Sequence, residues 1–353
     1  PGSEIVIGHY GSLTGNTAHF GQDTDKAVRL AVDEQNAAGG LLGKKIRVVT
    51  LDDRGDSAEA ANAVTRLIDV EKVSALIGEV ASSLSLAGGR VAQRRKVPMI
   101  SPSSTNPKVT QVGDYVFRVC FLDPFQGKVM ADFARDTLKF ERVGILKDVK
   151  NDYSIGLGDA FRTAFMARGG QIPIEQSFSA GDTDFSAQVT AIKAANVQGL
   201  YVPGYYTEVG EIARTADRLG LKVPLMGGDG WDSPDLFKIG GDALNGSYFS
   251  DHFAPDAATA KSKEFVDRFT KQYGTQPTGL GALGYDAAGV LFDAIKRAGK
   301  TDPASIRDAL ATTKNFEGVS GVISMNANRD ADKSAVIVEV EGGKAKYRAT
   351  ISP

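Results

Sequence analysis

The chain has 353 residues, 42% of them hydrophobic and 24% charged, which is the composition of a globular protein long enough for two domains. A net charge of −2 leaves no basic field for nucleic acid or anionic lipid, and every apolar run is shorter than a membrane span. One cysteine and three histidines, none in HxH or HxxxH spacing, exclude an internal disulfide and argue against a metal site, so we predict no metal and no cofactor.

The first hundred residues alternate between strand and helix patterns. The opening PGSEIVIGHYG enters an apolar strand almost at once, so no signal peptide is visible and the start fits a mature or recombinant chain. A helix over 23–38 ends at Gly39-Gly40, and a second helix begins at Asp56 with Glu59 as its capping-box partner. The pattern also predicts a helix over 82–96 and strands over 5–11, 45–53, 73–80 and 97–101.

The same alternation restarts at residue 142. RVGILKDV is a strand, GLGDAFRTAFMARGG a helix with a glycine stop, and QIPIEQSF a strand, in the order seen at residues 5–50. Two further helix–strand units follow up to residue 231. Nearly continuous apolar strands between helices indicate parallel sheets covered on both faces, so the predicted fold class is α/β, with two doubly wound lobes in tandem.

The lobes are joined by extended apolar segments, residues 115–123 and 247–255, rather than by a polar linker. Three helices follow residue 255, and a hairpin with a Gly342-Gly343 turn closes the chain. We place those helices on the first lobe, so the chain crosses between lobes more than once, and such strand-like crossings make a hinge beside a ligand cleft. The predicted lobes are residues 1–120 plus 251–325 (N-terminal) and 121–250 plus 326–353 (C-terminal).

Enzymatic chemistry finds little support in the sequence. The hydroxyl-rich stretch VPMISPSSTNP, residues 97–107, lies in no GxSxG pattern, and no histidine follows a strand in the manner of a triad base. GLGALG, residues 279–284, matches GxGxxG but is preceded by TQPT instead of a buried strand, so we interpret it as a flexible loop leading into a helix at Tyr285. We therefore predict that the protein is not an enzyme.

The sequence supports the binding of a small ligand better than it supports catalysis. Ser82 and Ser83 begin a helix after a strand, where free N–H groups and the helix dipole favour an anion, and SPSSTNP offers similar groups after the next strand. MGGDGWDSP places Asp229 among glycines at a strand end, close to Trp231, the only tryptophan. Hydroxyl-rich strand ends with an acid across a cleft suit a zwitterion, since each buried charge needs full hydrogen bonding.

The ordered set of motifs resembles the substrate-binding proteins of branched-chain amino acid ABC transporters, the Leu/Ile/Val-binding type of periplasmic binding protein. The resemblance covers essentially the whole chain. It is carried by GSLTGNTAHFGQDTDKAVRLAVDEQNAAGGLLGKKIRVVTLDD, IGEVASSLSLA, ISPSSTNP, FRVCFLDPFQG, GYYTEVGEIARTADRLGL and MGGDGWDSP, in that order.

The resemblance implies a type I periplasmic-binding-protein fold, in which a three-strand hinge joins two α/β lobes and an amino acid binds between them. It assigns Ser82, Thr105 and Tyr205 to the ligand carboxylate, and Asp229, Thr105 and the carbonyl of Ser103 to the ammonium. The residues implied around the ligand side chain are Phe20, Val80, Ala81, Tyr153 and Trp231.

Three departures from the family pattern stand out. A frequent family disulfide is missing, because Gly55 and Ala81 occupy its positions. The acid is Asp229 where the family often has Glu, and Trp231 is bulkier than expected, which leaves the size of the ligand open. The alternative ligands are alanine, γ-aminobutyrate, an aromatic acid, an amide or urea.

These inferences predict an extracytoplasmic solute receptor of an ABC importer that binds an aliphatic, branched-chain L-amino acid by lobe closure. The expected location is the periplasm or the outer face of the membrane, with a lipid anchor in a Gram-positive organism. The expected partners are the amino acid and a membrane permease, and the expected state is a monomer. Two rivals stay open: a cytoplasmic ligand sensor of the same fold, and an enzyme on a doubly wound fold.

Overall fold

The computed structural model describes residues 4–353 and divides the chain into two compact units. Unit 1 comprises Pro1–Phe121 and Ala258–Lys333, and unit 2 comprises Leu122–Ala257 and Ser334–Pro353. The chain therefore passes between the units three times. The second boundary lies later than the expected 250/251, because residues 248–251 form a strand in the sheet of unit 2. The third lies later than the expected 325/326, and Asp330 in that segment binds Arg118 of unit 1.

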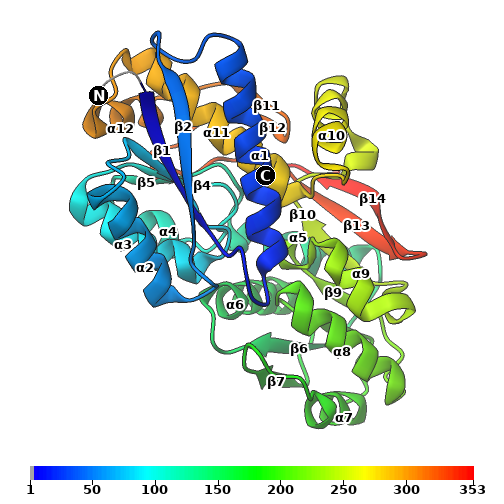
Figure 1. Cartoon of the computed structure of the whole chain (residues 1–353). Coiled ribbons are helices and arrows are strands. Elements are labelled where there is room, and N and C mark those ends of the chain that lie inside the picture. Colours follow the sequence, from blue (N-terminus) through cyan, green and yellow to red (C-terminus); the bar gives the residue numbers. More distant parts are fainter. Residues whose placement is uncertain (1–3) are drawn as a thin grey trace. The chain divides into compact units, whose positions relative to one another are not determined.

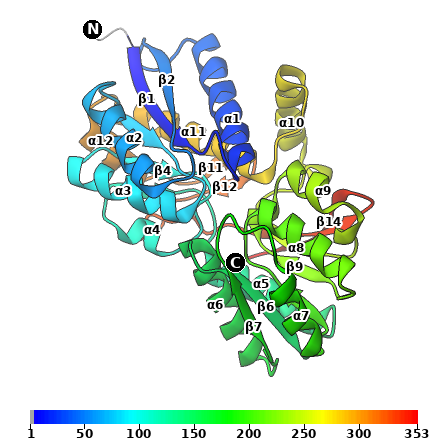
Figure 2. The same ribbon diagram turned by 60° about the horizontal axis from the view of Figure 1, so that its bottom comes forward.

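Unit 1 is built on a five-stranded parallel sheet in the order β2-β1-β3-β4-β5. The central strands are buried apolar runs, which agrees with a sheet that is covered on both faces (Figures 1 and 2). Its strands are β1 (Glu4–Gly11), β2 (Lys45–Asp52), β3 (Ala75–Ile77), β4 (Met99–Ser101) and β5 (Val116–Arg118); β11 (Phe316–Gly318) and β12 (Gly321–Ile323) form a separate hairpin.

Helices α1 and α11 pack together on one face of this sheet, and α2 and α3 on the other (Figures 1 and 2). The helices of unit 1 are α1 (Ala18–Ala37), α2 (Ser57–Asp69), α3 (Ser82–Arg95), α4 (Lys108–Gln111), α10 (Ala260–Tyr273), α11 (Gly279–Ala298) and α12 (Pro303–Ala311). The predicted N-cap of α2 is confirmed, since Asp56 Oδ1 accepts a hydrogen bond from Glu59 N at 2.9 Å. α1 starts five residues before the expected Asp23, because its N-cap, Thr17, makes no side-chain cap that the sequence could signal.

The GLGALG segment is helical, so its interpretation as a loop was wrong. Residues 279–284 form the first turns of α11, and Thr278 caps them by accepting hydrogen bonds from the N–H groups of residues 280 and 281. The glycines bring α11 close to α1: a Cβ on Gly281 would overlap Asp23 Oδ2, and one on Gly284 would lie 2.9 Å from Thr24 Cγ2. Close packing of two helices, rather than turn formation, explains these glycines.

We expect Gly281→Ala to destabilise the protein by about 1–3 kcal/mol, although alanine is the better helix former by about 0.5–1 kcal/mol. Asp23 Oδ2 accepts hydrogen bonds from the N–H and the hydroxyl of Thr278, at 3.1 and 2.8 Å, and cannot move away without losing them. The matched control is Gly89→Ala in α3, whose Cβ would meet Val116 at an ordinary 3.6 Å. Thermal unfolding of both variants checks this, and a stabilised Gly281→Ala variant would contradict the close packing.

Unit 2 has a seven-stranded mixed sheet in the order β14-β13-β10-β9-β8-β6-β7. The strands from β10 to β7 are parallel, whereas β13 runs antiparallel to both β10 and β14. The strands are β6 (Val143–Asp148), β7 (Glu175–Phe178), β8 (Gly199–Tyr201), β9 (Leu225–Gly227), β10 (Tyr248–Asp251), β13 (Ala335–Glu341) and β14 (Lys344–Ile351). The predicted closing hairpin with its Gly342-Gly343 turn is confirmed.

Helices α5 and α6 pack together on one side of this sheet, and α7, α8 and α9 on the other. The helices of unit 2 are α5 (Asp123–Asp136), α6 (Asp152–Ala167), α7 (Ser186–Ala194), α8 (Tyr206–Arg218) and α9 (Pro234–Gly240), with 3-10 turns η1 (Asp229–Trp231), η2 (Gly241–Leu244) and η3 (Pro255–Ala257). The alternation thus produces two α/β units, each built around parallel strands with helices on both sides of the sheet.

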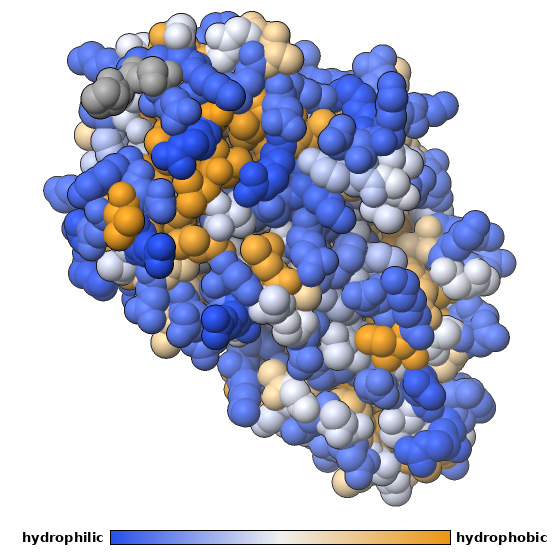
Figure 3. Space-filling model, in the orientation of Figure 1, coloured by the Kyte–Doolittle hydropathy of each residue, from blue (hydrophilic) through white to orange (hydrophobic). Residues whose placement is uncertain are grey.

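The outer surface is mostly polar. On the face shown in Figure 3, hydrophobic residues gather mainly around β1 and β2 of unit 1, and the rest of that face is predominantly hydrophilic. Large exposed hydrophobic side chains, such as Val70 at 63% and Val322 at 57%, occur singly. Within residues 4–353, no helix combines the length and the apolar character needed to span a membrane.

Candidate ligand-binding site

Two polar segments of unit 1 lie side by side because they follow neighbouring strands. β3 and β4 are parallel, with Ile77 opposite Ile100. Residues 78–82 follow β3, and residues 101–107, called here the 101–107 loop, follow β4. The carboxyl ends of parallel strands meet at one edge of the sheet, and there Ser82 Oγ accepts a hydrogen bond from Asn106 N at 3.2 Å.

Several hydroxyls in these segments bond to the protein itself. Ser101 Oγ donates to the carbonyl of Glu79 at 2.7 Å and accepts from Ser104 N at 3.0 Å. Ser104 Oγ lies 2.8 Å from the same carbonyl and 2.7 Å from Ser85 Oγ, which accepts from Glu79 N at 2.8 Å. These bonds tie the 101–107 loop to the residues after β3, so Ser101 and Ser104 have a structural role.

Ser103 and Thr105 are placed differently. Both side chains are buried, and neither hydroxyl oxygen has a hydrogen-bond partner within the described residues. Ser82, as predicted, begins helix α3, whose N-cap residue Ala81 makes no side-chain cap. An unpaired buried hydroxyl costs about 1–3 kcal/mol, so these groups and the N–H groups of α3 are available donors for an anionic ligand group.

A buried guanidinium holds the 101–107 loop in place. Arg118, at the end of β5 and 0% exposed, donates from Nη1 to the carbonyls of Ser104 and Asn106, each at 2.7 Å. Its Nε donates to Asp330 Oδ1 at 2.6 Å, and Nη2 donates to Thr110 Oγ1 at 2.8 Å. Residues far apart in sequence therefore fix the backbone that carries Ser103 and Thr105.

Glu79, which the sequence analysis did not single out, places a buried carboxyl in this region. Its side chain accepts hydrogen bonds from Ser12 Oγ and Ala81 N, each at 3.0 Å. Burial raises the pKa of Glu79 well above its usual range, and repulsion from Asp53 raises it further. The raised pKa means that the surroundings disfavour a negative charge on Glu79.

The predicted apolar residues of unit 1 are also buried. Phe20 in α1 is 2% exposed, and Val80 and Ala81, directly before α3, are 7% exposed each. The single thiol, Cys120, is fully buried and lies 3.2 Å from the carbonyl of Ser104, which agrees with a packed cysteine.

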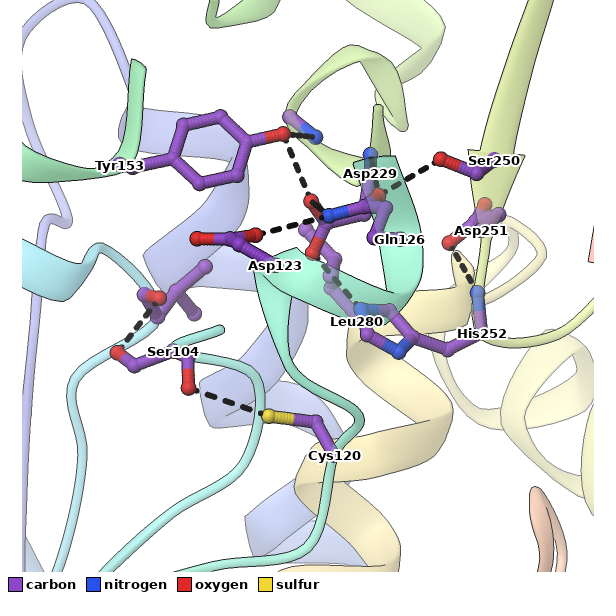
Figure 4. A network of polar contacts seen from close by, with 12 residues as sticks. Ser104, Cys120, Asp123, Gln126, Tyr153, Asp229, Ser250, Asp251, His252 and Leu280 are labelled. Atoms are coloured by element: carbon purple, nitrogen blue, oxygen red, sulfur yellow. Dashed lines mark hydrogen bonds and ion pairs between the residues drawn. The ribbon is translucent and has the colours of Figure 1, made fainter. Parts of the chain in front are cut away.

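In unit 2, Asp229 is the centre of a buried hydrogen-bond network (Figure 4). Its Oδ1 accepts hydrogen bonds from Tyr153 Oη at 2.7 Å and Gln126 Nε2 at 3.3 Å, and its Oδ2 lies 2.7 Å from His252 Nε2. Gln126 Oε1 in turn accepts from Asp229 N at 2.9 Å and from Ser250 Oγ at 2.8 Å. The Asp229 carboxylate is therefore oriented by three side chains from three separate elements.

Tyr153 and Tyr205, both predicted, lie together. Their rings stack with centroids 5.0 Å apart and planes 7° apart. Tyr153 Oη also accepts from Gly230 N at 2.9 Å, and burial together with the charge of Asp229 raises the pKa of Tyr153 well above 10. Tyr153 is therefore protonated and donates to Asp229. Tyr205 is the N-cap residue of α8 and is half-buried.

Trp231 occupies the interior of unit 2. Its side chain is 0% exposed, Nε1 donates to the carbonyl of Val202 at 2.9 Å, and the ring packs on Phe249 at 5.7 Å. A Cβ on Gly227 would overlap the indole, so the glycine makes room for it. The bulk of Trp231 is thus accommodated by packing within unit 2.

Gln126 and His252 were missed from the sequence. His252 directly follows β10, contrary to the expectation that no histidine follows a strand in the manner of a triad base. The nearby Ser250 donates to Gln126 and thus gives no Ser–His–Asp arrangement. The sequence offered one hint about His252, its position in the extended joint SYFSDHFAP. Periodicity alone could not connect that position with Asp229.

A cavity of about 260 Å³ in unit 1 lies elsewhere. It is bordered by α1, α11 and β11, and its lining includes Glu34, Lys261, Tyr285 and Phe316. None of the predicted ligand residues lines it. We therefore base the candidate site on the polar groups described above.

Comparison with known families agrees with this architecture. A sequence model of the family described as periplasmic binding protein matches residues 4–345. The Leu/Ile/Val-binding protein BraC3 of Rhizobium johnstonii is 31% identical over 347 residues, covering 97% of this chain and 93% of that protein.

Two solved structures are similar over almost their whole length. A leucine-binding protein of Thermotoga maritima has a TM-score of 0.95 at 43% identity, with 99% of each chain covered. A branched-chain amino acid transporter substrate-binding protein from Streptococcus pneumoniae, solved in complex with isoleucine, has a TM-score of 0.94 at 35% identity, again with 99% of each chain covered.

Proposed function

We propose that this chain, which belongs to the periplasmic binding protein family, is the solute-binding receptor of an ABC importer and binds a branched-chain L-amino acid. The similarity to proteins named for leucine, isoleucine and valine binding supports this ligand class. The family supports an extracytoplasmic location and a membrane permease as partner. The protein performs no chemical reaction, acts as a monomer, and carries a lipid anchor if the organism is Gram-positive.

One observation carries the proposal: the two units hold complementary sets of groups. Unit 1 has the unpartnered hydroxyls of Ser103 and Thr105 beside the N-terminus of α3, which suit a carboxylate. Unit 2 has the buried carboxylate of Asp229, which suits an ammonium. In the proposed complex an amino acid zwitterion engages both sets, and lobe closure completes the hydrogen bonds that each buried charge requires.

The proposed roles are those that the family resemblance implies. Ser82 and Thr105 bind the ligand carboxylate, and Tyr205 reaches it from unit 2. Because a carboxylate offers about four acceptor positions and three side chains already contact that of Asp229, the ammonium also needs the Ser103 carbonyl and the Thr105 hydroxyl. The proposed surroundings of the aliphatic side chain are Phe20, Val80, Ala81, Tyr153 and Trp231.

A thermal-shift screen tests the ligand class. It uses the twenty L-amino acids, γ-aminobutyrate, benzoate and urea, and a ligand at 100 times its dissociation constant adds about 2.7 kcal/mol of stability. We expect selective upshifts with leucine, isoleucine or valine. 4-Methylpentanoate, which lacks the ammonium, and 3-methylbutylamine, which lacks the carboxylate, are the matched analogues of leucine and produce no shift.

An upshift with benzoate or urea and none with amino acids would overturn the ligand assignment. Small-angle scattering with and without the active ligand tests the closure. Unchanged dimensions with saturating ligand would contradict it.

A further inference from the structure

His252 contacts Asp229, although it was not among the predicted ligand residues. His252 Nε2 lies 2.7 Å from Asp229 Oδ2, and both side chains are at most 5% exposed (Figure 4). The opposite oxygen, Oδ1, is held by Tyr153 and Gln126. The buried imidazole of His252 therefore contacts Oδ2, the carboxylate oxygen to which neither Tyr153 nor Gln126 donates.

We infer that His252 is a positioning residue for ligand binding: it orients the Asp229 carboxylate and adjusts its effective charge. The inference rests on the proposed function, since it concerns the group assigned to the ligand ammonium. With a proton on Nε2, the neutral imidazole donates to Oδ2 and leaves Asp229 its full negative charge. The short Asp side chain is thereby held in one orientation before any ligand arrives.

The electrostatic surroundings of His252 in unit 2 are acidic. Asp229 contacts its ring, Asp251 Oδ1 accepts from its backbone N–H at 2.7 Å, and Asp232 lies next to Asp251. Asp123 is linked to Asp229 through Gln126, whose Nε2 is 3.1 Å from Asp123 Oδ1. Burial raises the pKa of Asp251 well above its usual range, and repulsion from Asp232 and Asp229 raises it further.

Protonation of His252 competes with ligand binding. An imidazolium compensates the charge of Asp229 and repels an incoming ammonium, so the ligand binds better to the protein with neutral His252. By linkage, ligand binding in turn favours the neutral imidazole over the imidazolium. The ammonium and carboxylate of a free amino acid keep their charges between pH 5.5 and 7.5, so the ligand itself adds no pH dependence there.

Isothermal titration calorimetry with leucine tests this at pH 5.5, 6.5 and 7.5, in buffers of different ionisation enthalpy that reveal proton release. We expect the wild-type affinity to fall when the pH is lowered from 7.5 to 5.5, with proton release on binding. His252→Gln, which retains an N–H donor without a titrating ring, binds within about threefold of the wild type at pH 7.5 and shows neither effect. His252→Leu, which lacks the donor, binds more weakly at every pH.

The matched control is His9→Gln in unit 1. His9 is also buried and also contacts an aspartate, with Nδ1 2.9 Å from Asp25 Oδ1, but it belongs to no predicted ligand set. We expect this variant to keep the wild-type pH profile and proton release. If His252→Gln kept them as well, the inference would be overturned.

A measurement without ligand separates this inference from the proposed function. In ¹⁵N spectra of the free protein at pH 8, we expect a His252 Nε2–H signal protected from solvent exchange, which Asp229→Ala abolishes. Leucine binding without this signal would overturn the positioning role and leave the proposed function intact. The signal without any amino acid binding would overturn the proposed function and retain the Asp229 contact.

Discussion

Asp229→Ala is expected to weaken leucine binding by about 30- to 5,000-fold, which corresponds to the 2–5 kcal/mol lost when one partner of a buried charge pair is removed. The ammonium of the ligand would lose its only proposed anionic partner. The N–H and O–H groups of Tyr153, Gln126 and His252 would also be left facing the ligand ammonium. Calorimetric titration of leucine at pH 7.5 measures the loss.

Two further variants make the Asp229 result interpretable. Asp229→Asn preserves shape and one acceptor oxygen but removes the charge, so we expect it to bind almost as weakly as Asp229→Ala. Asp235→Ala removes a more exposed acid from the first turn of the adjacent helix α9 and leaves the affinity unchanged. Wild-type affinity in a folded Asp229→Ala variant, judged by its thermal transition, would show that the ammonium binds elsewhere.

Arg118→Met is expected to destabilise the protein by about 3–5 kcal/mol, the usual effect of breaking a buried ion pair by removing one member. The substitution leaves Asp330 buried without its guanidinium and removes donors from the carbonyls of Ser104 and Asn106. Because those carbonyls belong to the 101–107 loop, ligand affinity falls as well. Chemical unfolding, followed by probes in each unit, measures the stability of unit 1 separately from that of unit 2.

The matched control for Arg118 is an ion pair at the surface of the same unit. Arg95 and Asp69 are 46% and 42% exposed, so Arg95→Met should change the stability far less than Arg118→Met does. The double variant Arg118→Met/Asp330→Leu removes both buried charges and should recover part of the lost stability. An equal cost for Arg118→Met and Arg95→Met would contradict the role of the buried guanidinium.

The sequence predictions that are confirmed depend on local features of the chain. Short apolar strands alternating with amphipathic helices lead to parallel sheets, because each hydrophobic face must be covered. The Asp56 cap of α2, which accepts a hydrogen bond from Glu59 N, is one of these confirmed predictions. These features depend on residues within a few positions of each other, which is why a pattern in the chain reveals them.

The predictions that failed concern segments whose surroundings come from elsewhere. GLGALG resembles a loop because glycine disfavours helix, yet the close approach of α1 requires those glycines in α11. The start of α1 at Ala18 was missed because no capping side chain marks it. In both places packing between elements overrides the local propensity.

The proposed ligand residues divide in the same way. The strand ends that carry Ser82, Ser103, Thr105 and Asp229 can be located from the sequence, because polar groups following buried strands lie at the carboxyl edge of a sheet. Which hydroxyls are already bonded, as that of Ser104 is and that of Thr105 is not, depends on the tertiary structure.

By itself the sequence determined the α/β class, the tandem units, and the strand ends at which binding groups gather, since these follow from local periodicity and from ordered motifs. Only the tertiary structure decided how those groups are supported. Gln126 reaches Asp229 across 103 positions and Arg118 reaches Asp330 across 212. No local pattern encodes such pairings, because the tertiary fold brings together the side chains that hydrogen-bond to a buried charge, whatever their spacing along the chain.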